Sequence, residues 1–258
     1  MAVVALCSAS GSPGVTTTAL GMALLWPRPV LLVEADPTGG SGILAGYFRG
    51  IKSYGQGLVE LALSTEDIAD LLPQVAEPVG SSAASFIAGP RTHSQAPALT
   101  GLWAPLLRAL QDLEATGQDA IVDCGRLGLV GWPEPLLAEA DLSLIVCRTH
   151  LPAVAAARSW AESARRGHPT WAHPAVMLVG ERQPYSAREV SSVLGLPVHA
   201  VIADDPGSAA VLHRGVTVPD RFDHGPLVRS LQAAISAIDA VMRTRAEGLG
   251  VEAMSDVQ

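Results

Sequence analysis

The stretch Ala2-Val3-Val4-Ala5-Leu6-Cys7-Ser8-Ala9-Ser10-Gly11-Ser12-Pro13-Gly14-Val15-Thr16-Thr17-Thr18 begins as an apolar run and ends in hydroxyl side chains. Residues 2–7 are typical of a buried strand, and the run 16–25 predicts a helix that starts with threonines. The small residues between them predict a tight turn. In this order the backbone N–H groups of the turn and of the helix N-terminus face one point, which is how proteins cradle a phosphate.

The loop lacks the lysine that such a cradle normally carries. A phosphate-binding loop reads Gly-Lys-Ser/Thr at the helix start, because the lysine ammonium meets the outer phosphates. This chain reads Gly14-Val15-Thr16, and its single lysine, Lys52, lies far along the sequence. We therefore expect any anion here to be held by backbone groups rather than by a lysine.

Composition indicates one globular domain. The 258 residues are 48% hydrophobic and 16% charged, which suits one large core. We expect residues 1–247 to form a single domain and residues 248–258 to form a flexible tail. The formal charge of -8 and the scattered arginines argue against non-specific DNA binding over a broad basic face, and they leave more specific DNA contacts open.

The cysteines and the chain start bear on the cellular compartment. Cys7, Cys124 and Cys147 lie in or beside apolar runs at wide spacing, which indicates buried, reduced thiols in a cytoplasmic protein. The N-terminal residues lack a basic segment, and no apolar run approaches the ~18 residues of a membrane span. Neither export nor an integral membrane segment is expected.

Short β-like runs alternate with helix-like runs along the chain. This alternation predicts a three-layer α/β/α fold with a mostly parallel, doubly wound sheet. The predicted strands are 2–7, 29–34, 84–88, 119–123, 142–147, 175–180 and 198–202. The predicted helices are 16–25, 56–63, 66–72, 101–115, 152–166, 186–194, 207–213 and 226–245.

The last predicted helix carries an apolar stripe at helical spacing. Such a stripe is more typical of core packing than of a membrane face. It consists of Leu227, Leu231, Ile235, Ile238, Val241 and Met242.

Polar side chains follow the predicted strands where ligands of such sheets bind. Glu34 and Asp36 come after the second strand, and Asp123 ends the fourth. Carboxylates at these positions, together with the hydroxyl of Thr16, are what a Mg²⁺–phosphate site needs, because magnesium prefers oxygen ligands. Three arginines are placed to meet phosphate charge on the same rim: Arg126, Arg148 and Arg182.

Several of these stretches resemble motifs of the MinD/ParA group of P-loop ATPases. The deviant Walker A motif of that group, Lys-Gly-Gly-x-Gly-Lys-Thr-Thr, falls on residues 10–17, where four of eight positions match. Its Asp-x-Asp-Pro-x-Gly motif resembles residues 34–39, and its Walker B strand resembles residues 120–123. Residues 194–215 are similar to the closing segment, whose loop touches the adenine. The resemblance runs in order over about residues 1–245.

This resemblance implies a P-loop NTPase-like fold and a site for ATP or ADP with Mg²⁺. It gives magnesium-side and catalytic roles to Asp36 and Asp123, with Thr16 as the hydroxyl ligand. The candidate nucleotide contacts are Ser10, Gly11, Ser12, Pro13, Gly14, Val15, Thr16, Thr17, Arg182, Asp204 and Pro206.

Both lysines of the family motif are absent, because their positions hold Ser10 and Val15. Losing one charge-assisted hydrogen bond weakens nucleotide binding by about ten- to a hundred-fold. Hydrolysis loses more, since a cation on the transferred phosphoryl group contributes ~10³–10⁵ in rate. The resemblance thus implies a homodimeric positioning factor for a partner assembly with weak or lost ATPase activity. Eroded loops of this kind resemble the TadZ/CpaE-like branch, which places pilus and secretion machinery.

Other interpretations remain open at this stage. An arginine could replace the lysine in an active ATPase, or the chain could be an interaction scaffold that binds no nucleotide. Glu34 and Asp36 could merely cap the following helix, because Asp before Pro favours turns. Each of the three arginines could be solvated or salt-bridged instead of binding phosphate.

Overall fold

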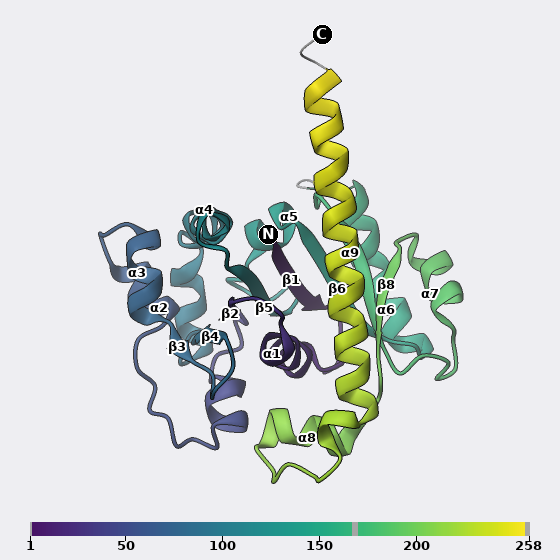
Figure 1. Ribbon diagram of the computed structural model, residues 1–258, viewed down its shortest axis with the longest axis horizontal. Helices are drawn as coiled ribbons and strands as arrows, with labels where there is room; N and C mark the ends of the chain where they lie inside the picture. Colours follow the sequence, from purple (N-terminus) through teal and green to yellow (C-terminus); the bar gives the residue numbers. More distant parts are fainter. Residues whose placement is uncertain (1, 167–169, 256–258) are drawn as a thin grey trace.

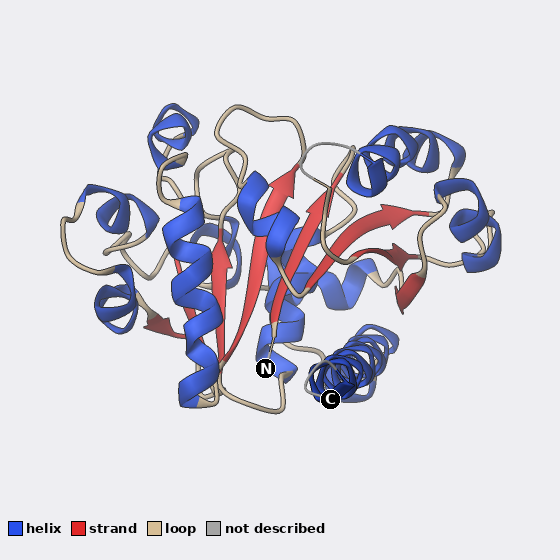
Figure 2. Cartoon of the chain, turned by 90° about the horizontal axis from the view of Figure 1, so that it is seen from above, coloured by secondary structure: helices blue, strands red, loops and turns tan. Residues whose placement is uncertain are grey.

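A computed structural model describes residues 2–166 and 170–255 of the chain. Its centre is an eight-stranded sheet in the order β3-β4-β2-β5-β1-β6-β7-β8, which runs across the middle of the molecule (Figures 1 and 2). The strands are β1 (Val3–Ser8), β2 (Val30–Glu34), β3 (Glu77–Pro78), β4 (Ala84–Ile87), β5 (Asp119–Arg126), β6 (Leu142–Arg148), β7 (Pro174–Val179) and β8 (Val198–Ile202).

The strand pairs of this sheet are parallel except for the short pair β3–β4. The central strands are apolar and buried on both faces, as parallel strands between two helical layers must be. The predicted mostly parallel, doubly wound sheet is therefore confirmed. The antiparallel β3 at one edge was not predicted, since its two residues carry no strand pattern.

Helices cover both faces of the sheet (Figure 2). One apolar core joins the sheet to α1, α8 and α9 through residues such as Leu20, Leu212 and Leu231. A second core joins the other face to α4, α5, α6 and α7 through residues such as Leu106 and Leu136. The helices are α1 (Val15–Leu25), α2 (Leu58–Leu63), α3 (Ile68–Val75), α4 (Trp103–Asp112), α5 (Glu134–Glu139), α6 (Leu151–Arg166), α7 (Ala187–Leu194), α8 (Pro206–Arg214) and α9 (Pro226–Ser255).

Most of the apolar stripe of α9 packs in the core, as predicted, whereas Val241 and Met242 are only half-buried. Leu227, Leu231, Ile235 and Ile238 are all buried. The helix is longer than predicted, because it continues past residue 245 to Ser255 and projects beyond the sheet (Figure 1). It thus enters the segment from residue 248 for which the sequence predicts a flexible tail, and residues 256–258 of that tail lie outside the described residues.

Other differences from the prediction are local. Helix α5, which begins after Pro133, was not predicted, because it is too short for a clear helical period. A π-helical turn over Ile43–Tyr47 was not predicted either. The predicted helix 101–115 divides at Leu113 into α4 and a 3₁₀ turn that ends at Gly117. Strand β5 extends to Arg126, so Asp123 lies within the strand rather than at its end.

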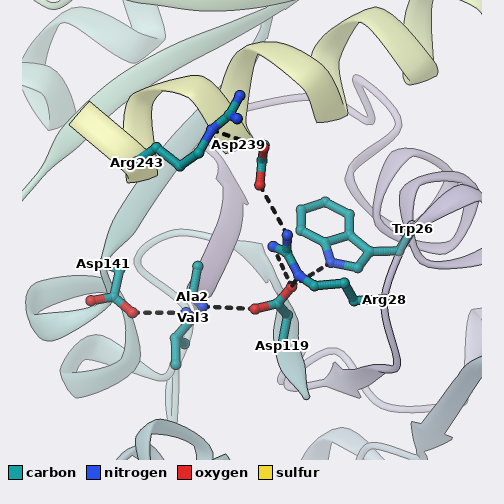
Figure 3. A network of polar contacts seen from close by, with 8 residues as sticks. All are labelled: Ala2, Val3, Trp26, Arg28, Asp119, Asp141, Asp239 and Arg243. Atoms are coloured by element: carbon teal, nitrogen blue, oxygen red, sulfur yellow. Dashed lines mark hydrogen bonds and ion pairs between the residues drawn. The ribbon is translucent and has the colours of Figure 1, made fainter. Parts of the chain in front are cut away.

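A buried carboxylate ties several elements together at the opposite end of the sheet from the loop 8–14. Asp119, at the start of β5, accepts hydrogen bonds from Ala2 N (2.9 Å), Trp26 Nε1 (2.7 Å) and Arg28 Nε (2.8 Å). Arg28 also pairs with Asp239 of α9 at 3.1 Å (Figure 3). The network therefore fastens β1, β5 and α9 to the segment after α1.

The three cysteines and the helices bear on the expectations about thiols and membrane segments. Cys7, Cys124 and Cys147 are buried and unpaired, as expected. In the described part of the chain, no helix has both the length and the apolar character needed to cross a membrane.

Candidate functional site

A crevice of about 630 Å³ opens at the carboxyl ends of the strands. One wall is the loop between β1 and α1, and the other is the segment after β8 with the start of α8. This is where a doubly wound sheet gathers its loops. The lining residues are Ser8, Gly11, Ser12, Pro13, Gly14, Val15, Thr16, Thr17, Thr18, Asp36, Thr38, Gly125, Arg126, Arg148, Val179, Ile202, Ala203, Asp204, Asp205, Pro206, Ala209, His213 and Leu227.

The loop has the backbone geometry of an anion cradle. Gly11 and Gly14 have φ angles of 67° and 103°, a left-handed region that glycine enters without steric cost. The first backbone bond of α1 runs from Thr18 N to Gly14 O at 2.8 Å. The N–H groups of residues 15–17 therefore precede the intrahelical ladder and can point to a ligand.

No side chain of this loop replaces the missing lysine. Val15 is only 6% exposed and packs in the core shared by α1 and the sheet. Pro13 is buried as well, and it has no N–H to offer an anion. The cradle thus consists of backbone amides and threonine hydroxyls without a cation of its own.

Asp123 is the fully buried acid of the site. Its side chain is fully buried, and Oδ1 accepts a hydrogen bond from Gly125 N at 2.9 Å. Its Oδ2 is buried without a hydrogen-bond partner among the described residues. Burial raises the pKa of Asp123 to about 7, and the charges of Asp36 and Glu34 add to this rise. The neighbouring Thr16 hydroxyl lowers the pKa of Asp123 and so opposes this rise. It does not form a hydrogen bond of good geometry with Asp123 Oδ2.

Asp36 lies against the end of β5. Its Oδ1 accepts a hydrogen bond from Thr38 N at 2.8 Å, which is the turn contact that Asp before Pro favours. Its carboxyl group also rests on Gly125, where a Cβ atom would come within 2.1 Å of Asp36 Cγ. Gly125 has a φ of 60°, so both its space and its backbone require glycine. Asp36 thus makes the turn and lines the crevice.

Glu34 has a structural role in this arrangement. It is buried, and its carboxylate accepts hydrogen bonds from Ile43 N (3.4 Å) and Gly89 N (3.3 Å). Burial raises the pKa of Glu34, while hydrogen bonds from Ser41 and from backbone amides oppose the rise. The carboxylate therefore holds the turn that starts the π-helical segment, so the capping interpretation fits Glu34 better than it fits Asp36.

The residues present fit a hydrated magnesium ion. A small cavity of about 120 Å³ lies between Thr16, Glu34, Asp36 and the turn 38–42. Within the described ranges, no group of three or more His, Cys, Asp or Glu side chains is arranged to enclose a metal. Magnesium keeps several waters and takes few protein ligands beside phosphate. Thr16 and Asp36 line this cavity and suit that kind of site, whereas Asp123 is fully buried beside Thr16 and lines neither the cavity nor the crevice.

The three candidate arginines have different surroundings. Arg126 is exposed and lines the crevice, whereas Arg148 lines it while paired with Asp204 at 2.8 Å. Arg182 is not part of the lining, and its backbone N donates to Tyr185 O in the loop after β7. The crevice therefore gathers two of the three, and Ser10 also stays outside its lining.

The far wall contains residues that the sequence analysis did not single out. Among them, His213 and Leu227 line the crevice, and Thr38, which follows β2, lines it beside Asp36. Asp204 and Pro206 were expected there, but the Arg148–Asp204 pair was not. The positions of His213 and Leu227 depend on how α8 and α9 pack on the sheet, and the Arg148–Asp204 pair depends on the packing of β6, β7 and β8. No local sequence pattern signals either arrangement.

Loop, sheet order and crevice together give the chain an α/β fold of the P-loop type. No protein-family profile matches the chain, and no curated protein matches it. Solved structures do. The MinD cell division ATPase of Pyrococcus furiosus matches with a TM-score of 0.70 and 13% identity, covering 93% of this chain and 99% of that one.

Two further structures support this result. Apo McdA of Cyanothece matches with a TM-score of 0.70 and 18% identity, over 92% of this chain and 99% of that one. The septum site-determining protein MinD of Pyrococcus horikoshii, in complex with Mg-ADP, matches with a TM-score of 0.69 and 14% identity, covering 93% of this chain and 96% of that one. The chain therefore has the fold of the MinD/ParA/McdA-type P-loop ATPases.

Proposed function

We propose that this chain is a cytoplasmic MinD/ParA-like positioning protein with a degenerate P-loop. It binds ATP or ADP with Mg²⁺, dimerises, and places a partner assembly of the pilus or secretion, septum or chromosome-partitioning kind. One observation carries the proposal. Residues 15–17 line the crevice with their amides, Thr16 among them neighbours the fully buried Asp123, whose Oδ2 has no hydrogen-bond partner among the described residues, and the lysine position holds the buried Val15.

The phosphate end of the nucleotide is held mainly by backbone. The free N–H groups at the start of α1 donate to phosphate oxygens, and the helix dipole favours their negative charge. Thr16, Asp36 and Asp123 hold the cation through oxygen atoms, directly or through water. When bound, Mg²⁺ would neutralise part of the phosphate charge.

Charge in the crevice makes the cation necessary. The lining holds three carboxylates, Asp36, Asp204 and Asp205, against two guanidinium groups, Arg126 and Arg148. Asp123 and Glu34 add buried acid behind the loop. A nucleoside triphosphate without Mg²⁺ is therefore repelled by these carboxylates, and we expect binding to require Mg²⁺.

Hydrolysis is expected to be weak or lost. Val15 places no charge on the transferred phosphoryl group, and such a charge contributes ~10³–10⁵ in rate. The protein then signals through nucleotide occupancy and dimerisation rather than through rapid turnover. An eroded loop of this kind supports the TadZ/CpaE-like branch as the most fitting assignment.

One observation favours a second candidate function, an active ATPase. Arg126 lines the crevice and is exposed, and no ion pair involves it among the described residues. It is therefore the arginine best placed to take over from the lysine. Arg148 is already engaged by Asp204, which makes it a weaker candidate. A third possibility, a scaffold without nucleotide, requires the cradle to stay empty.

Phosphate release and sedimentation of the purified protein separate these functions. The proposal expects little phosphate release above the buffer rate and a shift from monomer to dimer on adding Mg·ATP. An active ATPase instead releases phosphate steadily, and Arg126→Gln abolishes the release whereas Arg108→Gln, at an exposed position of α4, does not. A sedimentation profile that ignores Mg·ATP, together with no release, favours the scaffold and overturns the proposal.

A further inference from the structure

Arg148 and Asp204 form an ion pair inside the crevice. Arg148 ends β6 and Asp204 follows β8, so the pair reaches across the end of the strand between them, β7. Arg148 Nη1 lies 2.8 Å from Asp204 Oδ2, and the two side chains are 35% and 23% exposed. Both residues line the crevice together with the phosphate-cradle loop.

Because of this pair, only one of the two crevice arginines in the described part of the chain is free to bind a ligand. Arg126 and Arg148 are the arginines that line the crevice, and Asp204 engages the second of them. An ion pair exposed to this degree is weak, because water screens it and two side chains must be ordered to form it. A phosphate group can therefore compete with Asp204 for the guanidinium, which binds carboxylate and phosphate with the same geometry.

We infer that Asp204 is a lock that holds Arg148 away from the phosphates of a nucleotide. Nucleotide binding transfers Arg148 from Asp204 to phosphate, so Asp204 lowers affinity although it lies in the binding crevice. This inference rests on the proposed nucleotide binding and adds how affinity is set. Arg148 then supplies part of the charge that the missing lysine would have provided.

The neighbouring acid offers a matched control. Asp205 lines the same crevice, but its carboxylate accepts hydrogen bonds from Ser208 N (3.1 Å) and Ser208 Oγ (2.7 Å) and caps α8. These bonds lower the pKa of Asp205. Asn is also a good N-cap, so Asp205→Asn removes one negative charge from the crevice without releasing Arg148.

The test is calorimetric titration of wild type, Asp204→Asn and Asp205→Asn with ATP and with inorganic tripolyphosphate, both in excess Mg²⁺. We expect Asp204→Asn to bind both probes about ten-fold more tightly, as one recovered charge-assisted hydrogen bond allows. Asp205→Asn should gain less, because only general charge changes. Adding Arg148→Gln to Asp204→Asn should remove the gain, and a thermal melt confirms that each variant is folded.

Three results overturn the lock. The first is no gain in affinity for folded Asp204→Asn, and the second is an equal gain for Asp205→Asn. The third is a gain with ATP but not with tripolyphosphate, because that result would mean that Asp204 acts on the adenine base rather than on the phosphates. If wild type binds Mg·ATP and the gain is absent, the lock alone fails. If neither wild type nor Asp204→Asn binds either probe, the proposed function fails with it.

Discussion

Replacing Asp123 by asparagine should stabilise the ligand-free protein at neutral and alkaline pH. The carboxylate is buried with an unpartnered oxygen, and burial raises its pKa to about 7 from an ordinary 3.8. The folded protein therefore binds this proton more tightly than the unfolded chain does. Its contribution to stability is complete below about pH 4 and is lost as pH rises to about 7.

The size of the effect follows from the pKa difference. Each pKa unit corresponds to about 1.4 kcal/mol, so a fully charged Asp123 costs up to ~4 kcal/mol of folding free energy. Asparagine keeps the shape and the acceptor for Gly125 N but carries no charge. We expect Asp123→Asn to be about 2–4 kcal/mol more stable than wild type at pH 8 and close to it at pH 4.

Urea unfolding at pH 4, 6 and 8, followed by circular dichroism, measures this difference. The variant should also lose Mg²⁺-dependent nucleotide binding, since it gives up a cation ligand. A variant that is less stable than wild type at pH 8, or a stability gap that does not change with pH, would refute the reasoning. Such a result would mean that Asp123 is already neutralised or paired in the folded protein.

Three further substitutions test other parts of the account. Val15→Lys should raise Mg·ATP affinity about ten-fold by calorimetry and lower thermal stability by up to ~2 kcal/mol, because Val15 is a core residue; a folded variant with unchanged affinity would count against a P-loop geometry. Gly125→Ala should displace the Asp36 carboxyl group, cost at least ~1 kcal/mol and weaken Mg·ATP binding, because a Cβ there meets Asp36 Cγ at 2.1 Å; normal binding would remove Asp36 from the site. Asp119→Ala should lower the free energy of unfolding in urea by about 2–4 kcal/mol, since it leaves the Trp26 and Arg28 donors without their partner. It should leave nucleotide affinity unchanged, and a folded variant with weaker nucleotide binding would contradict the position of Asp119 at the far end of the sheet from the site.

The fold could be predicted because its signals are local. Continuous apolar runs such as residues 30–33 and 144–147 require burial on both faces, and their alternation with helical runs leaves few arrangements. The stripe of Leu227 and Leu231 likewise predicted a packed face. Short elements such as α5 escaped prediction, since six residues show less than two helical turns.

The site could be predicted only in outline. The loop, Asp36 and Asp123 stood out because they follow or end apolar strands, and the topology brings strand ends together. The length of β5 was not foreseen, so full burial of Asp123 was not either. The Arg148–Asp204 pair joins residues that lie 56 positions apart, and only the packing of β6, β7 and β8 makes them neighbours.

The central claim is that a lysine-free loop and the Asp123 carboxylate form a magnesium-dependent nucleotide site. The most direct test is calorimetric titration of the wild-type protein with ATP at pH 8, once in excess Mg²⁺ and once in EDTA. The account predicts saturable binding of one ATP per chain with Mg²⁺, and affinity at least about ten-fold lower in EDTA, because no cation then offsets the repulsion between the phosphates and the crevice carboxylates. The absence of binding in Mg²⁺, or equal affinity in the two buffers, would contradict it.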